Sequence, residues 1–441
     1  MELDLHRNET ETEVGSYFVA NYPPFSLWTP DQVAAAEAAL DAPCADRATT
    51  PLGLYLHIPF CRTRCKFCYF RVYTDKNSKQ VEDYLDALCR EVELYADRPG
   101  LAGRSFEFVY FGGGTPSFLS SAQLERLVGS ISRRWRWDDA REVTFECEPG
   151  TLKKSKLETI KQIGTTRLSL GVEHFNDEIL QLNGRAHKSP EILQAYQWAR
   201  EVGFDQINVD LIAGMMGDTE DGWRDTVDKT LALDPDCVTI YQMEVPHNSL
   251  IAQAARGGAG QVPVASWATK RAWVDEAFSR FEDAGYVVSS GYTLVKPGER
   301  SSFVYRDSVW HGADMIGMGV ASFSHFAGMH YQNLDQWSDY IDTIRDGRLP
   351  IARALPATEQ QLLIRELILQ LKLGRVDLSY FRGKFGVEVR DESAEALDRL
   401  SDEGMLTIDK DEIRLTRAGL LRVDALLPGF FEPQHRGVRY T

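Results

Sequence analysis

Short apolar runs alternate with amphipathic helical runs over residues 51–241. Short apolar runs are typical of buried strands, whereas apolar positions spaced three and four residues apart are typical of helices that cover a sheet. Strand, helix and strand repeated along one chain predict a parallel sheet. We expect strands at residues 54–58, 106–111, 142–147, 167–171, 206–211 and 238–241, with helices at 79–96, 121–135, 154–162, 190–201 and 220–233.

Six such units fit an α/β fold built on a partial (β/α)6 barrel of the TIM type. A doubly wound sheet is the alternative that the pattern allows. In parallel barrels the chemistry gathers where the strands end. The polar residues, glycines and cysteines at or just beyond the predicted strand ends are Cys61, Cys65, Cys68, Gly112, Gly113, Gly114, Glu146, Glu173 and Asp210.

The segments that flank the repeats are less regular. An Ala-rich helix at 30–40 either covers one end of the barrel or belongs to a poorly ordered leader. A helix at 266–284 and a strand at 286–290 precede a stretch rich in Gly, Ser and aromatic residues. Helices and a hairpin at 406–415 then predict a small winged-helix-like domain, which we interpret as a packing or lid domain. We divide the chain into an N-terminal extension (1–50), the barrel (51–290), a barrel-closing segment (291–355) and the C-terminal helical domain (356–441).

Composition and charge narrow the function. The 441 residues allow several domains, and a net charge of −16 disfavours nucleic acid or an anionic membrane as the main partner. No apolar run approaches the roughly 18 residues of a membrane span, and residues 1–20 lack the apolar core of a signal peptide. We therefore expect a cytoplasmic protein, in which an acidic substrate would need a local basic pocket.

Cys61, Cys65 and Cys68 form a Cys-x3-Cys-x2-Cys run directly after the first predicted strand. Soft thiolate ligands suit an iron–sulfur cluster, and three of them leave one iron open for an exchangeable ligand. A structural zinc site would need a fourth ligand, for which His57 and Cys89 are the nearby candidates. Disulfides are disfavoured because seven cysteines is an odd number and nothing suggests secretion.

The cysteine run, its lead-in at 55–60 and Phe-Gly-Gly-Gly-Thr-Pro at 111–116 resemble the radical S-adenosylmethionine (SAM) superfamily. The similarity is to the branch around oxygen-independent coproporphyrinogen III oxidase and covers about residues 51–430. It implies a [4Fe-4S] cluster that binds SAM at its open iron and cleaves it to methionine and a 5′-deoxyadenosyl radical. It also implies a small-molecule substrate, either a tetrapyrrole or another natural product, and an electron donor such as flavodoxin or ferredoxin.

The resemblance also implies contacts to the SAM at the cluster. It places the methionine amino group at the glycine loop and an adenosyl ribose at Glu146. Glu148 points to the same side of the strand, so the strand period does not distinguish the two carboxylates. We interpret Glu148 as a solvated loop carboxylate. The expected contacts are Tyr55, Phe67, Gly112, Gly113, Gly114, Thr115 and Glu146.

Further positions match a second SAM site of the family. Glu173 stands where the family usually has glutamine, so a carboxylate replaces a neutral amide. Arg185 is suited to a bidentate grip on a methionine carboxylate. Related proteins without oxidase activity share this Arg and the Asp at 210, so these two residues support the barrel more than the reaction. The expected set is Glu173, Arg185, Asp210, Met243 and Phe323.

Departures from the family pattern leave three activities open. The oxidases carry a fourth cysteine where this chain has Phe70, and the heme chaperones carry a His-Asn pair that is missing from residues 305–310. His311, His325 and His330 are alternative iron ligands, although we interpret histidines in this Gly-rich region as hydrogen-bonding loop residues. The alternatives are oxidative decarboxylation of a tetrapyrrole, methyl or methylene transfer from a second SAM by a radical methyltransferase or cyclopropanase, and heme binding without turnover.

Overall fold

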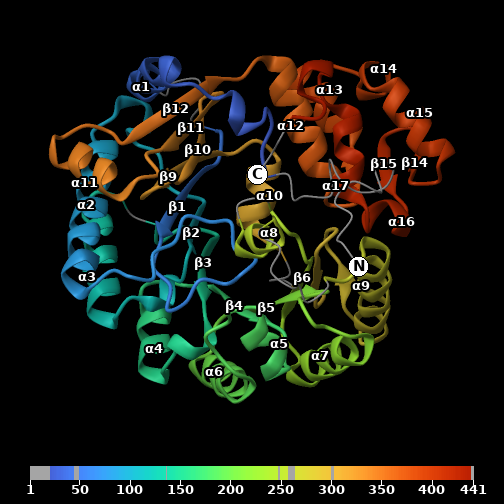
Figure 1. Cartoon of the computed structure of the whole chain (residues 1–441). Coiled ribbons are helices and arrows are strands. Elements are labelled where there is room, and N and C mark those ends of the chain that lie inside the picture. Colours follow the sequence, from blue (N-terminus) through green and yellow to red (C-terminus); the bar gives the residue numbers. More distant parts are fainter. Residues whose placement is uncertain are drawn as a thin grey trace.

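A computed structural model describes residues 20–43, 49–135, 137–246, 249–256, 264–298 and 302–438. Its centre is a sheet whose first six strands lie side by side in chain order and run parallel (Figure 1). This mostly parallel α/β arrangement confirms the expected fold class. The strands are β1 (Leu52–Ile58), β2 (Phe108–Gly113), β3 (Glu142–Cys147), β4 (Arg167–Glu173), β5 (Gln206–Ala213) and β6 (Cys237–Gln242).

Helices return the chain from each strand to the next, and their first residues explain where they begin. Asn77 and Ser120 form capping boxes, and Thr219 accepts a hydrogen bond from the backbone of Gly222. The short helix α5 (Asp177–Leu182) was not predicted, because it is too short to show a helical period. The other helices are α2 (Ser78–Ala96), α3 (Ser121–Ser132), α4 (Lys154–Gln162), α6 (Ser189–Val202) and α7 (Glu220–Leu233).

Residues beyond β6 extend the same sheet at both edges. β8 (Thr293–Val295) and β7 (Val287–Val288) continue it antiparallel beside β6. On the other side β9 (Asp314–Met318) pairs parallel with β1. Much of the segment expected to close the barrel, residues 291–355, therefore adds strands to the two edges of the sheet. Antiparallel strands β10 (Phe323–Phe326), β11 (Met329–Asn333) and β12 (Ile351–Pro356) complete the sheet, and helices α8 (Leu250–Arg256), α9 (Trp267–Asp283), α10 (Val304–Trp310) and α11 (Trp337–Arg345) connect these parts.

The C-terminal part is a small helical unit that includes the predicted hairpin. A three-stranded sheet joins β13 (Arg375–Asp377) to the hairpin of β14 (Leu406–Ile408) and β15 (Glu412–Leu415). At the other end of the chain, α1 (Val33–Asp41) packs on β11 and β12. None of the helices in the described ranges is both long and apolar enough to cross a bilayer. The C-terminal helices are α12 (Glu359–Leu371), α13 (Leu378–Phe385), α14 (Val389–Glu392), α15 (Ala394–Asp402), α16 (Arg417–Leu420) and α17 (Val423–Leu426).

Candidate radical SAM site

The cysteine loop leaves β1 and is held by backbone hydrogen bonds on both sides. The Cys61 N–H donates to the Tyr73 carbonyl at 3.0 Å, and the Tyr73 N–H donates to the Pro59 carbonyl at 2.7 Å. The Lys66 N–H donates to the Asn183 carbonyl, in the loop between α5 and α6, at 2.9 Å. The three thiols therefore lie on a loop that is fixed to its own base and to a distant part of the barrel.

Two of the three sulfurs accept hydrogen bonds from buried or partly buried side chains. Thr115 Oγ1 lies 3.4 Å from Cys61 Sγ, and Arg185 Nη1 lies 3.3 Å from Cys65 Sγ. Burial raises the pKa of the Cys61 thiol to about 11 and that of Cys68 to about 12. Metal binding must therefore displace protons from these thiols.

The donor set fits an iron–sulfur cluster better than a single zinc ion. Within the described residues, no group of three or more His, Cys, Asp or Glu side chains converges closely enough to hold one metal ion. A cubane binds each thiolate to a different iron, so three thiolates hold it without converging on one metal ion. The buried Nε of Arg185 has no hydrogen-bond partner, which leaves a donor for a ligand beside Cys65.

The glycine loop after β2 lies against the start of the cysteine loop. A Cβ on Gly114 would lie 2.8 Å from the carbonyl carbon of Pro59 and 2.9 Å from the Ile58 oxygen. Gly113 has a φ of +108°, and a Cβ there would meet the His57 ring at 2.5 Å. Only glycine allows the two loops to approach this closely.

Glu146 lies at the end of β3 and faces the glycine loop. Its carboxylate accepts hydrogen bonds from the Tyr110 hydroxyl at 2.6 Å and the Gly113 N–H at 3.2 Å. Burial raises its pKa to about 7 despite these bonds. Tyr110 was not predicted as a site residue, although it lies on the same face of β2 as Gly112. Its ring lies 4.3 Å from the ring of Tyr305.

Glu148 is not a solvated loop carboxylate, and that interpretation was wrong. The residue is 8% exposed. Its Oε1 lies 3.0 Å from His187 Nδ1 and accepts a bond from the Gly150 N–H at 3.1 Å. These contacts fold the β3–α4 loop, so Glu148 supports the loop while Glu146 faces the site.

Glu173, Arg185 and Asp210 come from β4, the loop before α6, and β5. Glu173 Oε1 lies 3.5 Å from Arg185 Nη2, and Glu173 has a left-handed φ of +64° at a bulge of β4. Burial raises the pKa of Glu173 to about 7, and it also raises the pKa of Asp210. Ser169 and Asn208 donate to Asp210 at 2.7 and 2.8 Å. No local pattern of residues predicts these two contacts.

The remaining predicted contacts lie in three places. The Tyr55 ring stacks on Tyr110 at 5.8 Å, next to Glu146. Phe67 and the buried Met243 join one apolar cluster beside α5 and β5. Phe323, by contrast, is 38% exposed on β10, and its ring contacts Phe25 and Trp28 of the N-terminal segment. The contacts described for Phe323 therefore join it to the N-terminal segment.

The histidines considered as metal ligands are engaged elsewhere. His57 is buried on β1, and burial lowers its pKa to about 4. His325 and His330 are not loop residues, contrary to our expectation. They are paired across β10 and β11, with their Nδ1 atoms 3.1 Å apart.

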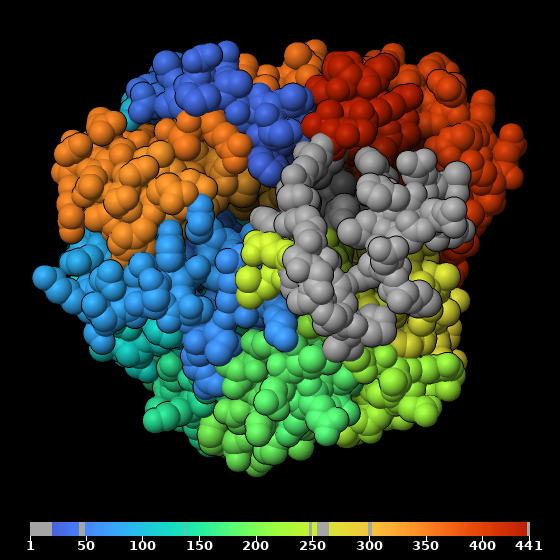
Figure 2. Space-filling view, in the orientation of Figure 1, coloured from blue at the N-terminus to red at the C-terminus, as the bar shows by residue number. Residues whose placement is uncertain are grey.

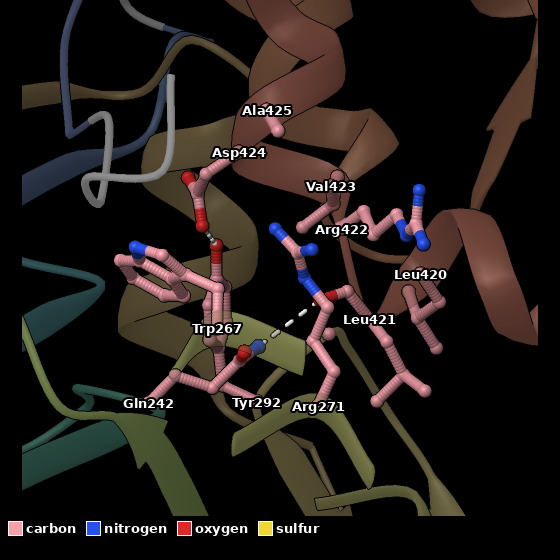
Figure 3. Close-up of a pocket in the computed structure, with 11 residues that line it drawn as sticks. Gln242, Trp267, Arg271, Tyr292, Leu420, Leu421, Arg422, Val423, Asp424 and Ala425 are labelled. Atoms are coloured by element: carbon pink, nitrogen blue, oxygen red, sulfur yellow. Dashed lines mark hydrogen bonds between the residues drawn. The ribbon is translucent and has the colours of Figure 1, made fainter. Parts of the chain in front are cut away.

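A small pocket lies between the barrel and the C-terminal unit (Figure 3). The Tyr292 hydroxyl donates to Asp424, and Gln242 Nε2 donates to the Leu421 carbonyl at 3.0 Å. Buried Lys372 also pairs with Asp424 at 3.0 Å. The bonds of Tyr292 and Gln242 fasten the C-terminal unit to β6 and to the residue before β8. The pocket lining includes none of the predicted SAM contacts.

Comparisons with known proteins agree with this geometry. Residues 55–230 match the model of the radical SAM superfamily, and residues 357–422 match the HemN C-terminal domain. The chain is 27% identical over 387 residues to the oxygen-independent coproporphyrinogen III oxidase of Escherichia coli, covering 85% of this chain and 84% of the relative. It is also 27% identical over 369 residues to the heme chaperone HemW of Bacillus subtilis, covering 83% and 96%. The solved structure of E. coli coproporphyrinogen III oxidase (HemN), a radical SAM enzyme, matches 94% of this chain and 96% of its own with a TM-score of 0.81 at 25% identity.

Proposed function

Because the chain belongs to the radical SAM superfamily, we propose that it is an enzyme that uses Cys61, Cys65 and Cys68 to hold its cluster and abstracts hydrogen from a small molecule. When bound, the [4Fe-4S] cluster and SAM supply one-electron cleavage of the sulfonium to the 5′-deoxyadenosyl radical. The observation that carries the proposal is the pair of hydrogen bonds from Thr115 and Arg185 to Cys61 and Cys65. They orient two of the three sulfurs from two different loops, one after β2 and one before α6.

The chain's own groups position the cofactor. The backbone of Gly112–Gly114 packs directly against Tyr110, His57 and the start of the cysteine loop, where any larger residue would clash. Glu146 is held by Tyr110 and by the Gly113 amide, so its oxygens are already oriented for ribose hydroxyls. Tyr55, stacked on Tyr110, provides an aromatic surface next to that carboxylate.

The test is anaerobic reconstitution with iron and sulfide, then incubation with SAM and dithionite and mass spectrometry of the nucleosides. We expect 5′-deoxyadenosine from the wild type and none from Cys65→Ala. Cys89→Ala, on α2, is the matched control and should keep the activity. A wild type with a full cluster and no 5′-deoxyadenosine would refute the proposal.

A second candidate is methyl or methylene transfer from a second SAM. The convergence of Glu173, Arg185 and Asp210 favours it, because a guanidinium and two carboxylates complement the carboxylate, ammonium and sulfonium of that molecule. Decarboxylation of a tetrapyrrole is less favoured because Phe70 replaces the fourth cysteine. S-adenosylhomocysteine among the products of the wild type, lost in Asp210→Asn, would support this candidate.

Heme binding without turnover is the third candidate, since HemW is among the relatives. The stretch that carries the His-Asn pair in the chaperones is α10 here. Its first two N–H groups, from Val304 and Tyr305, donate to the buried Glu142 at 2.9 and 3.1 Å. Stoichiometric heme binding together with an absence of SAM cleavage would support a chaperone.

A further inference from the structure

The guanidinium of Arg185 is a direct neighbour of a predicted cluster ligand. Its Nη1 donates to Cys65 Sγ at 3.3 Å, and its Nη2 donates to the Gly171 carbonyl at 2.5 Å. The side chain is only 12% exposed. A positive charge and a hydrogen bond are therefore presented to one cysteine sulfur from a position with little contact to water.

The stretch that carries Arg185 is packed against the cysteine loop. A Cβ on Gly184 would lie 3.1 Å from the Arg64 carbonyl oxygen and 3.5 Å from the Cα of Cys65. The Gly184 carbonyl also accepts a hydrogen bond from Thr63 Oγ1 at 3.0 Å. In Figure 2 the blue atoms of the cysteine loop region border the green atoms of the region around α5 and α6 on the face shown. The contact between Arg185 and Cys65 is thus held in place by the two packed backbones.

Glu173 is aimed at the same guanidinium by a strained stretch of backbone. Its Oε1 lies 3.5 Å from Arg185 Nη2. The residue has a left-handed φ of +64° at the bulge of β4, a conformation that is unfavourable for a residue with a side chain. A Cβ on Gly171 would lie 3.1 Å from each of these two atoms, so glycine leaves room for the pair. Strain of this kind concentrates at functional positions.

Two general effects connect the pair to the cluster. Hydrogen bonds to the cysteine sulfurs and nearby charges tune the reduction potential of an iron–sulfur cluster. Reduction adds one negative charge to the cluster, so a donor and a positive charge at Cys65 stabilise the reduced form. The carboxylate of Glu173 partly neutralises Arg185 and destabilises the reduced form. Both effects are stronger in buried surroundings than in water.

We propose that Arg185 raises and Glu173 lowers the reduction potential of the cluster. The inference rests on the proposed function, because it requires a cluster on the three cysteines. The step is the uptake of one electron by the oxidised cluster from an external reductant, with no bond formed or broken. Because Glu173 stands where the family usually has a neutral glutamine, the cluster of this chain is harder to reduce than that of the same chain with glutamine.

The experiment is a potentiometric titration of the reconstituted full-length protein without SAM. Dithionite is the reductant, redox mediators set the potential, and electron paramagnetic resonance measures the reduced cluster. The titration is made at pH 8, above the pKa of about 7 that burial gives Glu173. The test variants are Arg185→Met, Arg185→Lys and Glu173→Gln. The control variants are Arg200→Met and Glu201→Gln, which make the same charge changes in exposed ion pairs at the far end of α6.

We expect the ratio of reduced to oxidised cluster at the wild-type midpoint potential to fall about ten-fold in Arg185→Met, which is about 59 mV for one electron. Glu173→Gln should shift the potential in the opposite direction, and by less, because its carboxylate contacts Arg185 rather than the sulfur. Arg185→Lys keeps the charge without the planar fork, so its potential should lie between those of Arg185→Met and the wild type. Both control variants should keep the wild-type potential.

Equal potentials in all variants, or shifts of Arg185→Met and Glu173→Gln in the same direction, would overturn the proposal. If Arg185→Met takes up no cluster, Arg185→Lys and Glu173→Gln decide the two signs. Iron content and 5′-deoxyadenosine formation separate this failure from that of the proposed function. Unchanged potentials in an enzyme that forms 5′-deoxyadenosine refute this inference alone. Opposite shifts in a protein that has a full cluster and forms no 5′-deoxyadenosine refute the radical activity alone.

Discussion

The two halves of the site are built by different means. Beside β1 and β2, backbone meets backbone, and a Cβ on Gly114 has no room. Beside β3, β4 and β5, charged side chains are buried together, with Arg185 between Cys65 and Glu173. The first half is held by close steric fit, so its stability should change when a side chain there is enlarged. The second half is held by interactions between charged groups, so its stability should change with pH and when one member of an ion pair is removed.

Loss of Arg185 should have the largest effect. Arg185→Met leaves Glu173 without its ion pair, and the Cys65 sulfur and Gly171 carbonyl without their donor. Removing one partner of a buried pair costs about 3 kcal/mol. Urea unfolding of the cluster-free protein measures this cost. Arg200→Met, which breaks the exposed pair with Asp236, is the control and should cost less than about 1 kcal/mol. Equal costs would show that burial does not distinguish the two pairs.

The backbone-built half should respond to a single methyl group. In Gly114→Ala the new Cβ meets the backbone of Pro59 and Ile58, which cannot rotate away. Such overpacking costs about 1–3 kcal/mol and should lower the iron content after reconstitution. Gly129→Ala on α3 is the control; a Cβ there meets nothing within 4 Å. It should stabilise the protein by about 0.5–1 kcal/mol. Full iron loading of Gly114→Ala would contradict the close packing of the two loops.

The same contrast explains what the sequence could predict. The six strands of the barrel and the cysteine and glycine loops follow from contiguous patterns, and the structure reproduces β3, α4 and α7 at the predicted residues. The support of Asp210 by Ser169 joins residues on different strands, so no local period reveals it. Glu146 and Glu148 are two residues apart, so the strand period places them on the same side. Only the tertiary contact of Glu148 with His187 distinguishes their roles. β10 and β11 were missed because Gly and aromatic residues mask their alternation.

The charged half should make stability depend on pH. The pKa of Glu173 is raised to about 7 from an ordinary 4.5, so the unfolded chain loses this proton before the folded chain does. Its contribution to stability is therefore full below pH 4.5 and is lost as pH rises from there to about 7. Glu173→Gln should increase the free energy of unfolding by about 1–3 kcal/mol at pH 8, relative to its effect at pH 4.5.

Burial also raises the pKa of Glu91 and Glu146 to about 7, so these groups make the stability of the wild type depend on pH as well. The contribution of Glu173 is therefore measured as the difference in unfolding free energy between Glu173→Gln and the wild type at each pH. Glu91 accepts hydrogen bonds from Gly319, Asn333 and Tyr340, none of which is a predicted SAM contact, so Glu91→Gln provides the comparison. The stability of this variant should change with pH in the same direction while its SAM binding is unaffected. A pH-independent effect of Glu173→Gln would mean that Arg185 keeps Glu173 ionised throughout.

The smallest effect is expected outside both halves, at Phe70. Its ring is 46% exposed and lies 4.6 Å from that of Tyr69. Phe70→Cys, which supplies the fourth cysteine of the oxidases, should cost about 0.5 kcal/mol and leave iron content and 5′-deoxyadenosine formation unchanged. Phe70→Ser removes the same ring without adding a thiol. If Phe70→Cys alone decarboxylates coproporphyrinogen III, one residue of the cysteine loop selects the reaction. If neither variant does, the selection lies with the charged side chains of β3, β4 and β5, where glutamate has replaced the family's glutamine.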